Sequence, residues 1–454
     1  MMTFRASQED TPGRFGGGPA GNTLQVLKRI LRGRAPGIMA LHARRWAALA
    51  LGLSAAIALL PLAAVLPELA QAQPASGSAE GGGMCEFLLS PKIDVLTAKL
   101  DKAGAKGRAK VIDQFRAENA GGFPLIEDSL VTFVYVGKVA LRACVPSDLN
   151  GWDTKAHEMS RLGEADLYYR TLKLPRDARI DYKFYVDNGW MLDPLNPRTV
   201  KGGFGDNSAF AMPLYAEPAE IAQAEPASRG KIVEHQFSSK ALGNTRRLQV
   251  YLPVGYRPGA APAYPVVFVQ DGGEYLALAS MANVLDNLIA RGSIPPVIGV
   301  FIDPVDRNYE YYLNATYGRV VAEEIVPFVR QTYSVSREPA RNAIIGASLG
   351  GEISLMIALD HPDVFGKCGS QSGAFGIEEN HLINTVRRAS RKPVDVYLDC
   401  GTFEDLLGSN RAMRDALAAK GYGLRYQEFN EGHSWGNWRA HLDDMLLFFW
   451  GARK

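Results

Sequence analysis

The chain contains few cysteines and histidines, and its positive and negative charges nearly balance. Its 454 residues include four cysteines and seven histidines, and their spacing matches no metal-site pattern. The formal net charge is only +2. Residues 1–72 carry a net charge of +5, which leaves −3 on the rest of the chain. A mildly acidic body offers nucleic acid no basic surface, so we expect no nucleic-acid partner. We also expect no metal and no organic cofactor.

The first 73 residues have the pattern of an N-terminal extension with a signal peptide. Arg44 and Arg45 precede the apolar run 46–67, and Ala70-Gln71-Ala72 is a small-x-small cleavage signal. We therefore predict a signal peptide near residues 39–72 and a periplasmic or secreted mature protein. The apolar run is also long enough to span a bilayer. An uncleaved anchor, and with it a membrane contact, is the alternative.

The four cysteines are Cys85, Cys144, Cys368 and Cys400. An even number of cysteines in an oxidising compartment is compatible with disulfides. Cys368 and Cys400 lie on neighbouring predicted strands, so the sequence leaves a bridge between them open without fixing its geometry.

The chain before residue 231 divides by composition and by hydrophobic period. Residues 74–83 are a linker rich in Pro, Ser and Gly, and residues 84–122 have the apolar spacing of a helical segment. Across residues 128–216 the period changes to two, which predicts a β-sandwich. Its expected strands are Val131–Tyr135, Ala140–Val145, Leu167–Leu172 and Ile180–Val186. Residues 217–230 form a second linker, which leads into a larger domain, residues 231–454.

A Gly-x-Ser-x-Gly motif, Gly346 to Gly350, contains the candidate nucleophile Ser348. The predicted buried strand 342–345 precedes it, and the predicted helix 352–359 follows it. In so tight a turn only glycine fits two residues before and after the serine, because a side chain there would clash with the crossing backbone. This context favours a nucleophile elbow over a Gly-rich loop with an inert serine.

A serine nucleophile needs a histidine to accept its proton and a carboxylate to orient that histidine. In α/β hydrolases the chain order is serine, acid, histidine. Only two histidines lie well downstream of the serine. His433 lies in a polar loop, whereas His441 falls inside a predicted helix, residues 438–450. We therefore predict that His433 is the base.

The acid is expected in the loop after the penultimate strand of the sheet, which we predict over residues 394–400. Glu404 and Asp405 both lie in the loop that follows. Glu404 is the favoured acid, and Asp405 is the alternative.

The oxyanion of the tetrahedral intermediate needs two backbone N–H donors. One is expected from Leu349, immediately after the nucleophile. The other is expected from the loop after the predicted strand 264–270, where Gly272 or Gly273 lets the backbone approach the substrate. A plain Gly-Gly turn is the alternative.

Motifs from about residue 230 to the C-terminus resemble the esterase-D family, most closely its enterochelin-esterase branch. The matching stretches are Val269–Gly273, Phe301–Pro304 through Arg307 to Tyr311, Glu324–Phe328, Ile345–Gly351, His361–Gly366, Ser370–Gly373, Gly401–Glu404 and Gly432–Trp435 through Trp438-Arg439. The resemblance implies an α/β-hydrolase fold and a serine carboxylic ester hydrolase, with its Gly-Thr-x-Glu/Asp pattern placing the acid at Glu404. Ser434 departs from the Asp or Asn that often follows the histidine.

The predicted sandwich resembles the immunoglobulin-like, glycogen-binding-type modules that precede catalytic domains in glycogen-branching enzymes and enterochelin-esterase relatives. The matching stretches are Asp148–Trp152, Tyr182–Val186 and Trp190–Pro194. Exposed Trp152 and Trp190 would suit stacking on a sugar ring, although burial is the more common state of tryptophan.

The enterochelin-esterase resemblance implies a ferric catecholate siderophore as the ester substrate. Such a strongly anionic ligand favours nearby guanidinium groups, so Arg307 is a candidate contact and Arg319 a further one. A surface ion pair of Arg307 with Glu310 is the alternative. Tyr311 and Trp435 complete the candidate substrate contacts.

Other functions remain open at this level. An acetyl or feruloyl esterase acting on polysaccharide side chains would use the N-terminal module as a sugar anchor. An acyltransferase of the mycolyl type shares the fold. A non-catalytic binding protein is disfavoured, because serine, acid and histidine are all present.

Overall fold

The computed structural model describes residues 90–452. The predicted signal peptide, the linker 74–83, the first residues of the helical segment and Cys85 lie outside this range. Within it, no helix combines the length and the hydropathy that crossing a bilayer requires.

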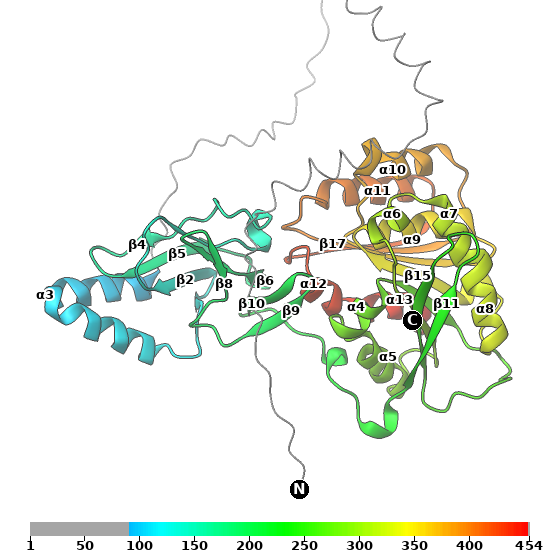
Figure 1. The fold of residues 1–454 in the computed structure, drawn as a ribbon, viewed down its shortest axis with the longest axis horizontal. Helices are drawn as coiled ribbons and strands as arrows, with labels where there is room; N and C mark the ends of the chain where they lie inside the picture. Colours follow the sequence, from blue (N-terminus) through cyan, green and yellow to red (C-terminus); the bar gives the residue numbers. More distant parts are fainter. Residues whose placement is uncertain (1–89, 453–454) are drawn as a thin grey trace, which may run out of the picture. The chain divides into compact units, whose positions relative to one another are not determined.

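The described chain begins with α3 (Pro91–Glu118), which packs against a small all-β region (Figure 1). Ser90 caps α3, because its hydroxyl accepts a hydrogen bond from the Ile93 amide at 3.2 Å. Gly104 interrupts α3 with a φ of 61°. Leu96 and Phe115 belong to the apolar face that α3 buries against the neighbouring strands.

Ten short strands over residues 125–211, together called the all-β region here, form three antiparallel sheets. The first sheet contains β1 (Leu125–Glu127), β2 (Leu130–Val136), β5 (Leu167–Lys173) and β4 (Ser160–Arg161). The second contains β6 (Arg179–Tyr182), β10 (Gly205–Ala211) and β9 (Thr199–Gly202), and the third β3 (Ala143–Cys144), β7 (Phe184–Val186) and β8 (Gly189–Met191). Side chains from all three sheets share one apolar core.

The single strand expected over Ile180–Val186 is two strands. β6 pairs with β10, whereas β7 pairs with β3 and β8. Between them, the Lys183 amide donates to the carbonyl of Pro146 and leaves the β6 ladder. Alternation of apolar residues continues through such a change of sheet, so the sequence pattern does not reveal it.

The second half of the chain forms one eight-stranded sheet with the order β11-β12-β14-β13-β15-β16-β17-β18. Its strands are β11 (Lys231–Ser238), β12 (Thr245–Leu252), β13 (Val266–Gln270), β14 (Ile298–Ile302), β15 (Asn342–Ala347), β16 (Lys367–Gln371), β17 (Asp395–Gly401) and β18 (Gly423–Phe429). The first two strands are antiparallel and the remaining six are parallel. This is the α/β-hydrolase fold.

Helices cover both faces of this sheet (Figure 1). They are α4 (Gly272–Ala277), α5 (Met281–Ala290), α6 (Arg307–Tyr311), α7 (Ala315–Arg319), the π-helical turn η5 (Val320–Ile325), α8 (Val326–Thr332), α9 (Leu349–Asp360), α10 (Ile377–Arg388), α11 (Leu407–Ala419), α12 (Trp435–Ala440) and α13 (Leu442–Trp450). Alternate side chains of β13 point to opposite faces of the sheet. Val266 and Phe268 pack in one apolar core with residues of α6 to α11. Val267 and Val269 pack in the other core with residues of α4, α5, α12 and α13.

The possible bridge between Cys368 and Cys400 is not formed. Both thiols are buried and free, as is Cys144. In the parallel register Cys368 lies opposite Val396, so the two cysteines are displaced along adjacent strands by four residues. This displacement exceeds the Cα separation that a disulfide tolerates.

Candidate active site

Ser348 lies in the turn between β15 and α9 with a strained backbone. Its φ is 58° and its ψ −124°, a conformation that a non-glycine residue rarely adopts. A Cβ at Gly346 would overlap the backbone of Gly350, so the first glycine of the motif is required by close approach. The turn raises Ser348 above the carboxyl end of the strands and leaves it half-buried.

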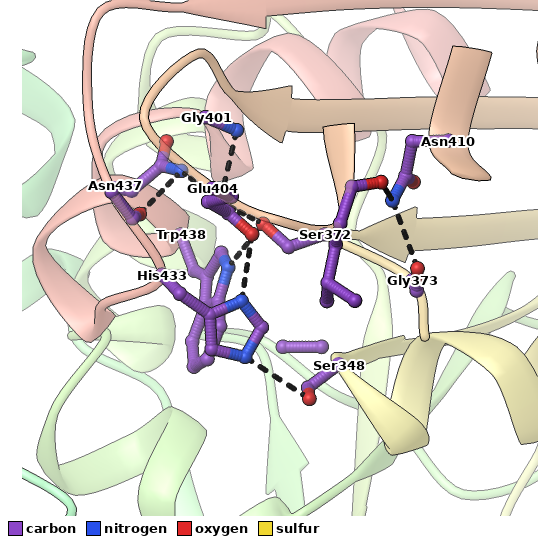
Figure 2. Close-up of polar contacts among 12 residues, drawn as sticks. Ser348, Ser372, Gly373, Gly401, Glu404, Asn410, His433, Asn437 and Trp438 are labelled. Carbon is purple, nitrogen blue, oxygen red and sulfur yellow. Dashed lines mark hydrogen bonds and ion pairs between the residues drawn. The ribbon is translucent and has the colours of Figure 1, made fainter. Parts of the chain in front are cut away.

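The structure brings three of the predicted residues into one hydrogen-bonded chain (Figure 2). His433 Nε2 lies 3.1 Å from Ser348 Oγ, and His433 Nδ1 lies 2.7 Å from Glu404 Oε2. Glu404 follows β17, and His433 lies in the loop between β18 and α12. Asp405, the alternative acid, is exposed.

The second oxygen of Glu404 accepts several donors. Oε1 receives the Ser372 hydroxyl at 2.6 Å, the Gly401 amide at 2.9 Å and Asn437 Nδ2 at 3.3 Å. Trp438 Nε1 donates to Ser372 Oγ at 3.0 Å. An indole nitrogen can only donate, so the proton of Ser372 is directed at Glu404. These contacts fix one carboxylate oxygen and leave the other for His433 (Figure 2).

The sequence pattern does not reveal these supporting residues. Ser372 lies in the Ser370–Gly373 stretch, which was recognised only as a family motif. Its positive φ of 47° is a second sign of a constrained position, but this becomes visible only in the fold.

Aromatic rings form one wall beside the histidine. The rings of His433 and Trp438 meet edge to face, with centroids 5.0 Å apart and an interplanar angle of 89°. Trp435 packs between Trp438 and Tyr275 at 4.8 Å and 5.1 Å. Trp435, a predicted substrate contact, is only 7% exposed, so most of its surface serves this packing.

Two backbone amides remain available for an oxyanion. Leu349 is the first residue of α9 and Gly272 the first of α4, and the first amides of a helix lack an intrahelical acceptor. Gly273, the other predicted donor, already donates its amide to Asp303 Oδ1 at 2.7 Å. A Cβ at Gly272 would overlap the backbone of β14, so this glycine is required by packing.

Arg307, the candidate substrate contact, forms a bidentate ion pair with Asp271, and the alternative pair with Glu310 is not formed. Its Nε and Nη2 donate to the two carboxylate oxygens of Asp271, each at 2.8 Å. Glu310 instead pairs with buried Arg246. Burial raises the pKa of Asp271, and the hydrogen bonds from Arg307 oppose that rise. Asp271 immediately precedes the Gly272-Gly273 segment, which is called the oxyanion loop here, so the ion pair fixes the start of this segment.

Tyr311 was predicted to contact substrate, but it is fully buried. Its hydroxyl accepts a hydrogen bond from the Asp271 amide at 2.9 Å, and its ring lies under Arg307. Tyr311 therefore holds the backbone at Asp271 in place from the buried side, away from the substrate. Arg319 is exposed and donates to Thr316.

No group of His, Cys, Asp or Glu side chains within residues 90–452 is arranged to hold a metal ion. The tryptophans of the all-β region form a partly exposed cluster. Trp190 is 51% exposed and contacts Trp152 and Tyr185, with centroids 6.5 Å and 5.3 Å away.

Known proteins resemble this chain in sequence. Residues 239–449 match the family model described as "Putative esterase". An iron(III) enterobactin esterase of Escherichia coli O6:H1 is 25% identical over 336 residues, which cover 66% of this chain and 83% of that protein. An endo-1,4-beta-xylanase/feruloyl esterase of Xylanibacter ruminicola is 27% identical over 282 residues, which cover 58% and 37% of the two chains.

The fold has a solved counterpart. The ferric enterobactin esterase of Salmonella typhimurium superposes with a TM-score of 0.63 at 23% identity, over 71% of this chain and 93% of that one. Residues 239–449 thus resemble this esterase family, and the matches support a hydrolase that acts on esters.

Proposed function

We propose that the protein cleaves its ester through an acyl-enzyme formed on Ser348. The observation that carries this proposal is the continuous chain from Ser348 Oγ through His433 to Glu404. A hydroxyl, an imidazole and a buried carboxylate in this order supply a nucleophile, a general base and a group that orients the base.

Each residue then has one role. His433 Nε2 accepts the Ser348 proton as Oγ attacks the ester carbonyl, and Glu404 stabilises the imidazolium that forms. The Leu349 amide and the Gly272 loop stabilise the oxyanion. Collapse of the intermediate breaks the ester C–O bond, and His433 returns its proton to the leaving alkoxide. Water, activated by the same histidine, then releases the acid product.

The proposed substrate is a ferric catecholate trilactone siderophore. The support is that iron(III) enterobactin esterases match this chain over two thirds of its length, with a shared fold. Local chemistry is compatible with aromatic acyl groups. Phe204 is completely exposed at the tip of the β9–β10 hairpin. A Cβ built on neighbouring Gly203 would lie 3.5 Å from Trp435 Nε1, next to the aromatic wall.

A second substrate class is supported by different observations. The relative from Xylanibacter ruminicola has a feruloyl esterase in its name. We also propose that residues 128–216 are an immunoglobulin-like module, which is supported by ten antiparallel strands around one core. On such a module the exposed ring of Trp190 would suit a sugar.

We also propose that the protein is exported from the cytoplasm. Export is supported by the Arg-Arg pair, the apolar run and the Ala-x-Ala signal of the sequence.

The deciding experiment compares ferric enterobactin with acetylated and feruloylated xylo-oligosaccharides, with Ser348→Ala as the control. We expect the highest kcat/KM on the ferric trilactone and no turnover by the variant. A preference for sugar esters would transfer the proposal to polysaccharide side chains. Unchanged turnover by Ser348→Ala would refute the site itself.

A further inference from the structure

We propose that the all-β region positions the catalytic triad, because it holds the two loops that carry Glu404 and His433. This inference rests on the proposed function. The acid loop is defined here as residues 401–406, and the histidine loop as residues 430–436. Both contact the all-β region through residues adjacent to Glu404 or His433.

Two glycines of the histidine loop are required by contacts with the all-β region. A Cβ at Gly432, directly before His433, would overlap the side chain of Asp148. A Cβ at Gly436 would overlap the guanidinium of Arg179. Glycine on both sides of the histidine therefore allows the loop backbone to lie directly on these two side chains.

Asn430 connects both loops to the all-β region. Its backbone carbonyl accepts the Arg179 amide at 3.1 Å, and its Nδ2 donates to Asp177 at 2.8 Å. Its Oδ1 accepts the hydroxyl of Thr402, from the acid loop, at 2.9 Å. The backbone and side chain of this one residue thus fix the spacing between the two loops and their position beside β6.

The acid loop also packs against the apolar core of the all-β region. Phe403, the residue before Glu404, packs against the cluster that includes Val131, Phe133 and Phe210. Its amide donates to the Glu431 carbonyl at 3.2 Å, which joins the two loops a second time. Movement of Glu404 away from His433 would disturb this packing contact.

Buried charges reinforce the contact. Arg179 is 4% exposed and lies 2.9 Å from Asp181, with Asp148 and Glu431 as further acidic neighbours. Glu431, in the histidine loop, accepts a hydrogen bond from His441 Nε2 at 2.8 Å. Breaking one partner of such a buried group is costly, because the remaining charge is left without compensation.

A module that only binds substrate predicts a different outcome from one that positions the triad. If the all-β region acts through substrate contacts, its variants will alter turnover of a large ester alone. If it positions Glu404 and His433, its variants will lower kcat even for 4-nitrophenyl acetate, whose acetyl group is too small to extend far from Ser348.

The test compares Arg179→Met with Arg176→Met in the full chain, both assayed on 4-nitrophenyl acetate. Arg176 is a matched control, since it makes an exposed ion pair with Asp128 in the same region. We expect Arg179→Met to lower kcat at least about tenfold with KM within about threefold, and Arg176→Met to match the wild type. Reaction of Ser348 with a small fluorophosphonate should slow in parallel, because it depends on the same histidine.

A double variant tests the contact itself. Gly436→Ala alone should lower kcat, because its methyl group displaces Arg179 or the histidine loop. With Arg179→Ala the overlap disappears, so the combined loss should be smaller than the product of the two single losses. Strictly multiplicative losses would contradict direct contact between these residues.

Measuring the Tm of each variant shows whether it still folds. If Arg179→Met does not fold, Asp177→Ala decides, because Asp177 is exposed and loses only its hydrogen bond to Asn430. We then expect a twofold to fivefold lower kcat. The inference is overturned if the deciding variant behaves like Arg176→Met. The proposed function fails separately, if the wild type hydrolyses no ester or Ser348→Ala remains active.

Discussion

The Ser372 hydroxyl donates to Glu404 Oε1 at 2.6 Å, and its direction is fixed because Trp438 donates to the same hydroxyl oxygen. Ser372 does not touch the substrate in the proposed mechanism. It acts on catalysis only by holding the carboxylate that orients His433, which makes it a positioning residue.

Replacing this hydroxyl should lower turnover without weakening binding. Ser372→Ala leaves Glu404 one donor short and Trp438 Nε1 without an acceptor, so we expect kcat to fall about tenfold with KM nearly unchanged. Ser372→Gly would relax the positive φ and should show the same loss. Ser336→Ala is the matched control, since Ser336 is also buried and its hydroxyl oxygen accepts one amide. Equal kcat for all variants would exclude the positioning role.

The choice between the two acidic residues of the acid loop is testable by single substitutions. Glu404→Gln removes the charge that holds His433, and we expect kcat to fall by about 10³–10⁴-fold. Asp405→Asn should stay within about twofold, because Asp405 is exposed. Steady-state kinetics on 4-nitrophenyl acetate measure both. A larger loss for Asp405→Asn would reverse the assignment.

The sequence predicted the parts of this site that depend on local chemistry. The α/β-hydrolase fold is confirmed by the sheet order and the solved counterpart, and the match to the esterase family model supports an ester hydrolase. Ser348 and His433 were recognisable because an elbow and a polar loop have local signatures. Their catalytic roles stay predictions until the variants are measured.

The remaining features depend on which segments meet in space. The sequence offers Tyr311 as a substrate contact, but the fold places its ring under Arg307. Arg307 pairs with Asp271 across 36 residues of sequence, whereas the nearer Glu310 pairs with Arg246. The contacts of Asn430 join three segments, and no periodicity or motif encodes such a junction.

The Arg307–Asp271 pair predicts a loss of activity on neutral esters. Arg307→Gln leaves a carboxylate that is 2% exposed without its partner, and this carboxylate precedes the oxyanion loop. We expect kcat on 4-nitrophenyl acetate to fall about tenfold and Tm to decrease. Arg307→Lys should recover little, because an ammonium cannot form the bidentate pair.

The control for this substitution is Arg319→Gln, since Arg319 is an exposed arginine nearby in sequence. If Arg307 served only to attract an anionic substrate, the neutral ester would be hydrolysed at the wild-type rate and only the siderophore would be affected. That outcome would remove the proposed support of the oxyanion loop.

The buried carboxyl of Glu352 should make the stability of the folded protein depend on pH. This α9 carboxyl is fully buried, and within residues 90–452 neither oxygen has a hydrogen-bond partner. Burial raises its pKa from 4.5 to about 8. The folded protein therefore binds this proton more tightly than the unfolded chain. The resulting stability is fully present below about pH 4.5 and is lost as the pH rises through about 8.

Glu352→Gln should remove that dependence. We expect the Tm of the variant, relative to wild type, to increase between pH 6 and pH 9 by several degrees. Calorimetric scans at both pH values measure it, with the exposed Glu323→Gln as control. A Tm difference that is equal at both pH values would contradict a protonated Glu352.

The exposed side chain of Phe204 should raise kcat/KM for large esters but not for small ones. The Phe204 side chain is completely exposed, so its burial by a ligand would contribute about 2 kcal/mol of hydrophobic free energy. The hairpin that carries it lies beside Trp435. A substrate ring bound at the triad is a suitable partner for this side chain. We therefore expect Phe204→Ala to lower kcat/KM for ferric enterobactin about fivefold to tenfold more than for 4-nitrophenyl acetate. Leu141→Ala, another exposed apolar residue of the all-β region, should leave this ratio unchanged. If both variants preserve the ratio, Phe204 does not contact the substrate, and the aromatic surface at the site is limited to the wall around Trp435 and Trp438.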